Sequence, residues 1–128
     1  MRRVTGIGGI FFKSPDPQRL TAWYRTHLGM DIAAWGGVAF TWAGPHNPGG
    51  VGSTIWSAMP DDADSFAPGA APFMINYRVD DLHALLAALR AEGCQVLDKV
   101  DDGDYGKFGW LIDPDGNKVE LWQPPAGQ

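Results

Sequence analysis

Apolar and polar positions follow two different periods along this chain, and each change of period marks a structural element. Residues 6–13 form an almost continuous apolar run, which is typical of a buried strand. Asp16 and Pro17 then favour a helix start, because Asp accepts from free N–H groups and Pro fits the first helical turn. Apolar residues follow at helical spacing as far as Gly29, so a helix is predicted between these points.

Shorter apolar stretches predict three more strands in the first half of the chain, at residues 30–34, 38–42 and 53–58. Residues 43–52, with two prolines and four glycines, predict a loop. Residues 59–71 contain Asp and Pro without any period and indicate a linker.

The same plan repeats after the linker. Residues 73–79 alternate as a strand, Asp81 caps a second helix rich in leucine, and Gly93 ends it. Three strands follow at residues 95–98, 106–113 and 118–122. Asp16 and Asp81 are 65 residues apart (81 − 16), and several apolar helix positions share that offset.

This internal repeat predicts the fold class. We expect one α+β domain over residues 1–128, made of two βαβββ units at about residues 5–58 and 72–123 and joined by the linker 59–71. One helix covers the outside of each half, and the other face of the strands looks into a cleft.

Period-two alternation assigns every second residue of a strand to this cleft face, and most of the residues so assigned are polar or aromatic. On the first, fifth and eighth predicted strands these residues are Gly9, Phe11, Lys13, Met74, Asn76, Arg78, Lys118, Glu120 and Trp122. An unpaired carboxylate is costly to bury, so Glu120 is expected to have a partner there. Arg78 is the predicted partner, because it is a cation on the same face.

Composition narrows the functional classes. Ten basic against fifteen acidic residues give a net charge of −5, and no basic cluster extends beyond Arg2 and Arg3, which argues against nucleic acid as a partner. No apolar run approaches the roughly 20 residues of a membrane span, so a soluble, cytoplasmic protein is expected. Cys94 is the only cysteine, which excludes an intrachain disulfide. Six tryptophans fit an aromatic-lined cavity, with ordinary core packing as the alternative.

Three stretches carry a resemblance to a known family: AWYRTHLGM (residues 22–30), INYRVDDL (75–82) and GWLIDPDGNKVELWQP (109–124). They resemble the vicinal oxygen chelate superfamily, which includes glyoxalases, bleomycin resistance proteins and extradiol dioxygenases. The resemblance implies a U-shaped, eight-stranded half-barrel cleft with two outer helices. It also implies a homodimer.

The resemblance places metal ligands on the first and last strands of each unit in those members that are metalloenzymes. Glu120 matches the last such position, but Gly9 and Met74 stand where ligands are usual, and residues 53–58 offer no carboxylate. We therefore expect no cofactor and no metal site, with Glu120 as the single ligand if a divalent metal does bind. His27, His46 and His83 fall outside the predicted cleft strands and are expected to be structural or exposed.

The chain is accordingly expected to bind a small organic molecule in an aromatic-lined cleft. The predicted ligand-binding residues are Phe11, Lys13, Met74, Asn76, Arg78, Trp110 and Trp122, with Trp42 and Trp56 as further candidates for the walls. Glu120 is the candidate catalytic residue, as a base or hydrogen-bond acceptor. Tyr105 and Lys107 fall on a predicted lid loop.

Two alternatives stay open. The first is a metal-dependent lyase or isomerase of the glyoxalase type, with Glu120 as a metal ligand. The second is a protein whose cleft is vestigial and whose role is dimerisation or partner binding.

Overall fold

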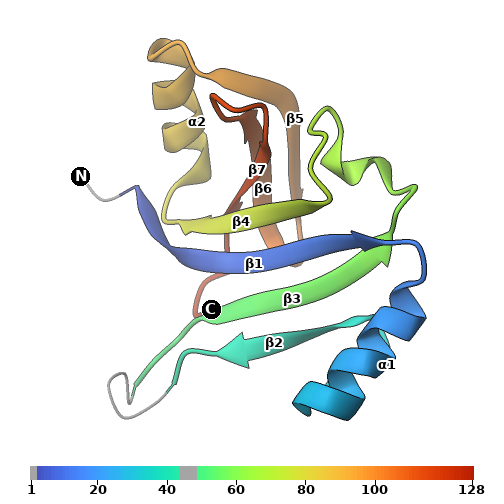
Figure 1. Ribbon diagram of the computed structural model, residues 1–128. Helices are drawn as coiled ribbons and strands as arrows, with labels where there is room; N and C mark the ends of the chain where they lie inside the picture. The colour runs from blue at the N-terminus through green and yellow to red at the C-terminus, as the bar shows by residue number, and fades with distance from the viewer. Residues whose placement is uncertain (1–2, 44–48) are drawn as a thin grey trace.

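The computed structural model describes residues 3–43 and 49–128 as one mixed sheet with two helices against it (Figure 1). The helices are α1 (Pro17–Leu28) and α2 (Leu82–Ala91), and a short 3-10 helix, η1, covers Asp64–Phe66. The strands are β1 (Val4–Ser14), β2 (Gly37–Thr41), β3 (Ser53–Pro60), β4 (Phe73–Val79), β5 (Gln95–Gly103), β6 (Gly106–Ile112) and β7 (Lys118–Gln123). The predicted α+β class is confirmed.

Both helices begin where the sequence predicted, α1 ends at Gly29 as predicted, and α2 ends at Ala91, with Glu92 between it and the predicted stop at Gly93. The side chain of Asp16 accepts a hydrogen bond from the backbone N–H of Arg19, and Asp81 accepts the equivalent bond from Ala84. Gly29 ends α1 in the left-handed conformation, with φ of 65°, which glycine adopts without steric cost. Neither helix is long and apolar enough to cross a membrane.

The strand order in the sheet is β2-β3-β1-β4-β7-β6-β5. The first strand of each unit pairs in parallel with the last strand of that unit, β1 with β3 and β4 with β7. The two units join through the antiparallel pair β1–β4 at the centre of the sheet. In Figure 1, strands β5 to β7 run steeply across the direction of β1 to β4, so the sheet curves around one of its faces.

The sheet of the described residues has seven strands where eight were predicted, because the strand predicted at residues 30–34 does not form. The backbone there bonds locally instead: Ile32 N–H donates to Met30, Ala33 N–H donates to Gly37, and Gly36 N–H donates to Ala33. These bonds form a turn that leads directly into β2. The apolar residues of this segment predicted a strand. Ile32 is indeed buried, but no neighbouring strand pairs with the segment.

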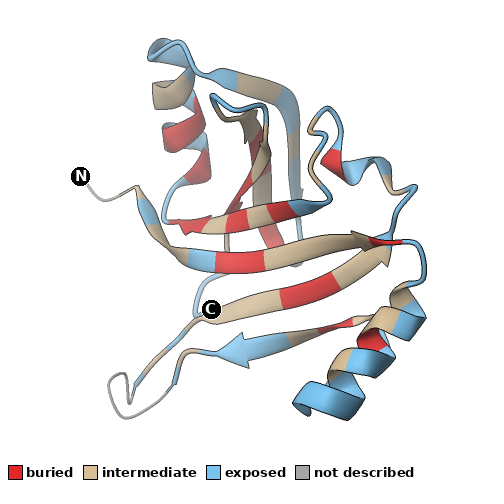
Figure 2. Cartoon of the chain, in the orientation of Figure 1, coloured by how far each residue is buried: buried red, intermediate tan, exposed pale blue. Residues whose placement is uncertain are grey.

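Two apolar clusters lie on opposite faces of the second half-sheet (Figure 2). Under α2, Leu82, Leu85 and Leu86 pack on Val79 and Leu121. On the concave face, the second cluster consists of Phe66, Met74 and Trp110.

Phe66 comes from the segment predicted to be a linker, yet it is only 1% exposed. Its aperiodic sequence gave no sign of this, because one anchoring ring produces no period. The segment therefore closes one end of the concave face.

Candidate functional site

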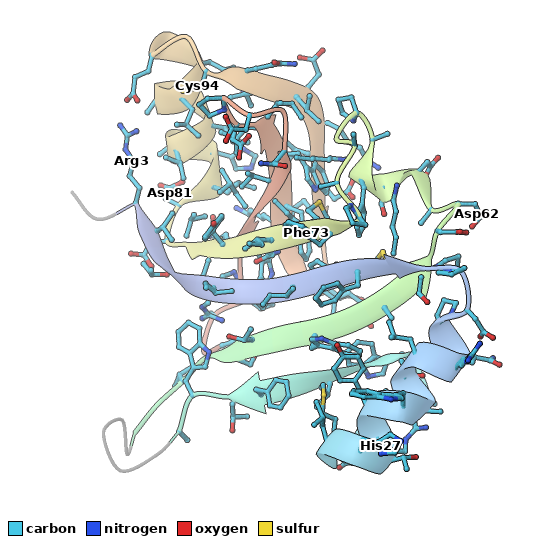
Figure 3. All side chains as sticks on the ribbon, in the orientation of Figure 1. Arg3, His27, Asp62, Phe73, Asp81 and Cys94 are labelled. Carbon is cyan, nitrogen blue, oxygen red and sulfur yellow. The ribbon has the colours of Figure 1, made fainter. Side chains whose placement is uncertain are left out.

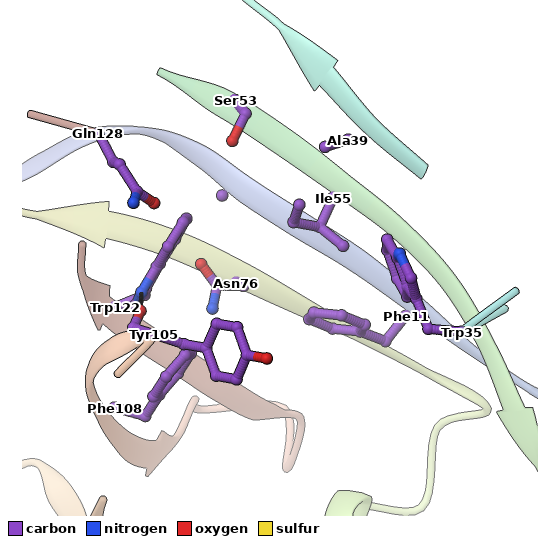
Figure 4. A pocket seen from close by; sticks show the side chains of 11 residues that line it. Phe11, Trp35, Ala39, Ser53, Ile55, Asn76, Tyr105, Phe108, Trp122 and Gln128 are labelled. Carbon is purple, nitrogen blue, oxygen red and sulfur yellow. Dashed lines mark hydrogen bonds between the residues drawn. The ribbon is translucent and has the colours of Figure 1, made fainter. Parts of the chain in front are cut away.

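The concave face contains a cavity of about 610 Å³, which is within the usual size range of small-molecule sites (Figure 4). Its lining comes from six strands and the segments next to them: Gly8, Phe11, Trp35, Ala39, Ser53, Ile55, Asn76, Tyr105, Phe108, Trp122 and Gln128. In Figure 4, Trp122, Tyr105 and Phe108 lie on one side and Phe11, Ile55 and Trp35 on the other. The walls are therefore mainly aromatic and aliphatic.

A bulge in β1 gives the cavity its floor. The pairing of β1 with β4 shifts between Ile7 and Gly9, so Gly8 is an extra residue in the ladder. A Cβ atom on Gly8 would overlap Asn76 Oδ1 and would lie 2.8 Å from the ring of Trp122. Only glycine lets the backbone approach these two side chains so closely.

Glu120 lies at the centre of a buried hydrogen-bond network beside the cavity. Asn76 is its neighbour in the parallel pair β4–β7, and Trp110 is opposite it in the antiparallel pair β6–β7. Asn76 Nδ2 donates to Glu120 Oε1 at 2.6 Å, and Trp110 Nε1 donates to Oε2 at 2.9 Å. With Glu120 only 8% exposed, both carboxylate oxygens are bonded within the protein.

Burial raises the pKa of Glu120, because the apolar surroundings disfavour its charged form. The bonds from Asn76 and Trp110 and the charge of Lys118 oppose this shift, while the charge of Asp101 adds to it. A carboxyl group with a raised pKa can exchange a proton closer to neutral pH than an exposed glutamate.

Arg78 is not the partner of Glu120, so that prediction is wrong. Among the described residues no ion pair joins the two side chains. Arg78 instead lies between two indole rings, with its guanidinium carbon 4.7 Å from the ring centroid of Trp42 and 5.3 Å from that of Trp122. Its Nη2 donates to the main-chain oxygen of Gln128 at 2.5 Å. The period-two pattern correctly placed Arg78 on the concave face. It could not show that the Asn76 amide and the Trp110 indole already supply hydrogen bonds to both oxygens of Glu120.

The predicted ligand-binding residues divide into three groups in the structure. Phe11, Asn76 and Trp122 line the cavity. Met74 and Trp110 lie in the cluster beneath Phe66, and Lys13 Nζ lies 5.2 Å from the centroid of the Phe66 ring, so these three are beyond the cavity at its closed end. Arg78 lies beyond the other end, where Gln128 separates it from the main cavity.

Sequence reasoning missed several lining residues, among them Trp35, Ile55, Phe108 and Gln128. Trp35 lies in the turn that follows directly after the strand predicted at residues 30–34, and nothing in its immediate sequence indicated the cleft. Trp56, considered for the walls, packs against Tyr24 of α1 at 4.8 Å between ring centroids, on the other face of the sheet. The predicted lid loop is a tight hairpin, in which β5 continues to Gly103 and β6 begins at Gly106.

The residues around Glu120 do not fit a metal ion. Its two oxygens are engaged by N–H donors, and a metal would have to displace both. Gly9 has no side chain to offer, and Met74 is packed against Phe66 and Trp110. In the described part of the chain, no group of three or more His, Cys, Asp or Glu residues could hold an ion.

The histidines and the cysteine that the structure describes lie outside the cavity lining. His27 contacts the ring of Trp23 at 5.2 Å in the last turn of α1 (Figure 3). His83 is in α2, and His46 lies outside the described residues. Cys94 is exposed at the turn between α2 and β5 (Figure 3).

The raised pKa of Glu120 predicts how stability depends on pH. The folded state holds the proton of this carboxyl more tightly than the unfolded chain, whose glutamate titrates near 4.5. The stability that Glu120 contributes is therefore full below that pH and is lost as the pH rises through the folded pKa.

We expect the free energy of unfolding of the wild type, minus that of Glu120→Gln, to fall as the pH is raised from about 4.5. Urea denaturation of both proteins across this range measures the difference, and the titration of all other groups cancels in the subtraction. A difference that is constant, or that grows with pH, would show that the carboxyl is not destabilised by burial.

Comparison with known proteins places this geometry in a family. A family model described as a glyoxalase-like domain matches residues 9–122. No curated protein sequence matches the chain.

Solved structures share its fold. Methylmalonyl-CoA epimerase from Mycobacterium tuberculosis has a TM-score of 0.65 and 21% identity, covering 98% of this chain and 91% of that one. A variant of the Streptomyces coelicolor methylmalonyl-CoA epimerase, in complex with 2-nitronate-propionyl-CoA, has a TM-score of 0.68 and 18% identity, covering 98% of both chains. A glyoxalase/bleomycin resistance protein/dioxygenase superfamily member from Vibrio splendidus has a TM-score of 0.59 and 13% identity, covering 91% and 97%.

Identities this low show a common fold and leave the ligand open. The family model, in contrast, covers most of the chain and includes both units and Glu120. The chain therefore belongs to the glyoxalase-like domain family of the vicinal oxygen chelate superfamily.

Proposed function

We propose that this protein binds a small, planar and largely apolar organic molecule in the cavity of the concave face, without a metal at Glu120. The cavity itself is the observation that carries the proposal. Its volume of about 610 Å³ would hold a ligand of two or three fused rings, and its walls are mostly ring and aliphatic carbon. Only a few of the lining side chains are polar, among them Asn76 and Ser53, and these would fix the orientation of the ligand.

The predicted ligand-binding residues take different roles in this proposal. Phe11, Asn76 and Trp122 contact the ligand. Arg78 contacts the end of the ligand that reaches past Gln128. Met74, Trp110 and Lys13 support the closed end of the cavity. Glu120 acts through Asn76, because the amide lies between the carboxylate and the cavity. We therefore regard Glu120 as a positioning residue that fixes the orientation of Asn76.

Membership of the glyoxalase-like family supports a second candidate function, a metal-dependent lyase or isomerase in which Glu120 is a ligand. A buried carboxyl with a raised pKa at the family's last-strand position is the observation in its favour. The N–H donors on both oxygens of Glu120 argue against it, so we place it second.

A substitution that fills the cavity tests the first proposal. Ala39 is an exposed lining residue, so Ala39→Phe would place a ring in the cavity without disturbing the buried core. We expect it to weaken binding of 2-naphthamide, a neutral planar probe, by at least about tenfold, the effect of roughly 1.4 kcal/mol. Quenching of tryptophan fluorescence reports the binding.

The matched control is Ala91→Phe, which adds the same ring at the exposed end of α2, outside the cavity lining. It should bind the probe as the wild type does. The proposal fails if no compound in a panel of planar aromatic probes binds, or if both variants bind as tightly as the wild type.

Metal content separates the two candidate functions. After dialysis against Ni²⁺, Zn²⁺ or Mn²⁺ and then buffer, we expect elemental analysis to find no stoichiometric metal in either the wild type or Glu120→Gln. About one metal per chain in the wild type, lost in Glu120→Gln, would favour the lyase and would require assays with hemithioacetals.

We also propose a homodimer. Large apolar side chains on α1, β2 and the segment between them are solvent-exposed: Trp23 at 51%, Leu28 at 61%, Trp35 at 59% and Phe40 at 47%. Light scattering should give twice the chain mass for the wild type. Leu28→Asp should shift the protein towards the monomer, and Ala91→Asp should not; a monomeric wild type contradicts the proposal.

A further inference from the structure

Tyr105 lines the main cavity with a side chain that is almost entirely in solvent. It is 81% exposed, whereas Trp35 is 59% and Trp122 is 8% exposed in the same lining. None of the ring pairs found among residues 3–43 and 49–128 includes Tyr105. A single exposed ring is normal on a protein surface, but this one stands at the mouth of a cavity with aromatic walls.

The backbone of Tyr105 has little freedom to move, because it lies in the short connection of the β5–β6 hairpin. Gly103 pairs with Gly106, so only Asp104 and Tyr105 lie between the two strands. The φ angles of these two residues are not positive, and Gly106 has a φ of 109°, a conformation that favours glycine. Strand pairing on both sides therefore fixes the point from which the tyrosine ring projects.

The tip of the hairpin is also attached to the cavity wall. Trp122 Nε1 donates to the main-chain oxygen of Tyr105 at 2.8 Å. A Cβ atom on Gly106 would overlap the main-chain oxygen of Gln123 and would lie 2.9 Å from Trp122 Nε1. Glycine therefore lets the hairpin lie directly against β7, and the same indole that lines the cavity holds Tyr105 in place.

The ring of Tyr105 points across the cavity. In Figure 4 it extends from the side of Trp122 and Phe108 towards Phe11 on the opposite side. Phe108 and Trp122 already stack on each other, with 9° between their planes. A flat molecule that fills the cavity as far as its mouth would pass beside the Tyr105 ring, which no other described ring covers.

We propose that Tyr105 stacks on the ligand at the mouth of the cavity, and that this contact selects an aromatic ligand over an aliphatic one with the same carbon skeleton. Two aromatic rings attract each other beyond the effect of the area they bury, whereas an aliphatic ring gains from the area alone. The hydroxyl of Tyr105 stays in water. This inference rests on the proposed function, to which it adds the class of ring in the ligand and the residue that recognises it.

Substitutions of Tyr105 separate the ring from the hydroxyl. We expect Tyr105→Ala to bind 2-naphthamide at least about tenfold more weakly than the wild type, because the stacking surface is lost. Tyr105→Phe keeps the ring and should bind within about twofold of the wild type. Isothermal titration calorimetry measures both affinities.

A saturated probe tests the selection of an aromatic ring. Decahydronaphthalene-2-carboxamide has the carbon skeleton of 2-naphthamide without its π-system, so we expect the wild type to prefer 2-naphthamide. Tyr105→Leu replaces the ring by an apolar side chain that cannot stack, and it should reduce this preference several-fold. Tyr105→Phe should keep the preference in full.

Two controls show that the effect belongs to the cavity mouth. Phe73 is an aromatic residue of β4 that is 45% exposed and outside the main cavity lining, so Phe73→Ala should bind 2-naphthamide as the wild type does. Because the Tyr105 side chain is exposed, Tyr105→Ala should unfold at the same urea concentration as the wild type.

A pair of glycine substitutions tests the fixed position of the hairpin. Gly106→Ala would push the hairpin tip away from β7, so it should weaken binding of 2-naphthamide although Tyr105 is intact. Gly103→Ala is the matched control, since a Cβ atom there meets open space. Gly106→Ala also crowds Trp122, so the same change is made in Tyr105→Ala, where the larger part of its effect should disappear.

The outcomes separate this inference from the proposed function. If 2-naphthamide binds Tyr105→Ala as tightly as the wild type, Tyr105 is not a contact and the cavity stands without it. If Tyr105→Phe binds as weakly as Tyr105→Ala, or if Tyr105→Leu keeps the full aromatic preference, stacking is the wrong interaction. A lower urea midpoint for Tyr105→Ala would assign the ring to the stability of the fold instead. If neither probe binds the wild type, the proposed function fails and this inference fails with it.

Discussion

The buried carboxylate of Glu120 is the constraint on which the concave face depends. It ties strand β7 to both of its neighbours in the sheet, through Asn76 of β4 and Trp110 of β6. A carboxylate this deeply buried is stable only if its oxygens are bonded, so the positions of the amide and the indole are fixed together with it. The bond from Asn76 to Glu120 also fixes the orientation of the Asn76 amide, which is a polar group of the cavity lining.

Glycine and tryptophan act together around this network. Three glycines, at positions 6, 8 and 52, lie where any side chain would overlap Trp42, Asn76 or Trp122. The absence of side chains at these points lets large rings and a buried amide pack directly against backbone. The result is a cavity that is closed at one end by Phe66 and bounded by Gln128 at the other.

Local chemistry made much of this fold predictable. The caps at Asp16 and Asp81, the left-handed Gly29 and the alternation of β4 depend on near neighbours in sequence, and each is found where it was predicted. The failures involve distant partners. Residues 30–34 have strand-like composition but no strand to pair with, and Phe66 is buried by residues that its own segment does not reveal.

The sequence by itself determined the secondary structure of both helices, the two-fold repeat and the face on which Asn76, Arg78 and Glu120 lie, because caps and periodicity are properties of adjacent residues. Only the tertiary structure decided which of these side chains meet. Glu120 bonds to Asn76 and Trp110 because strand register places them beside it, while Arg78 is held between Trp42 and Trp122. Register and the bulge at Gly8 arise from pairing between strands far apart in the chain, which no local pattern encodes.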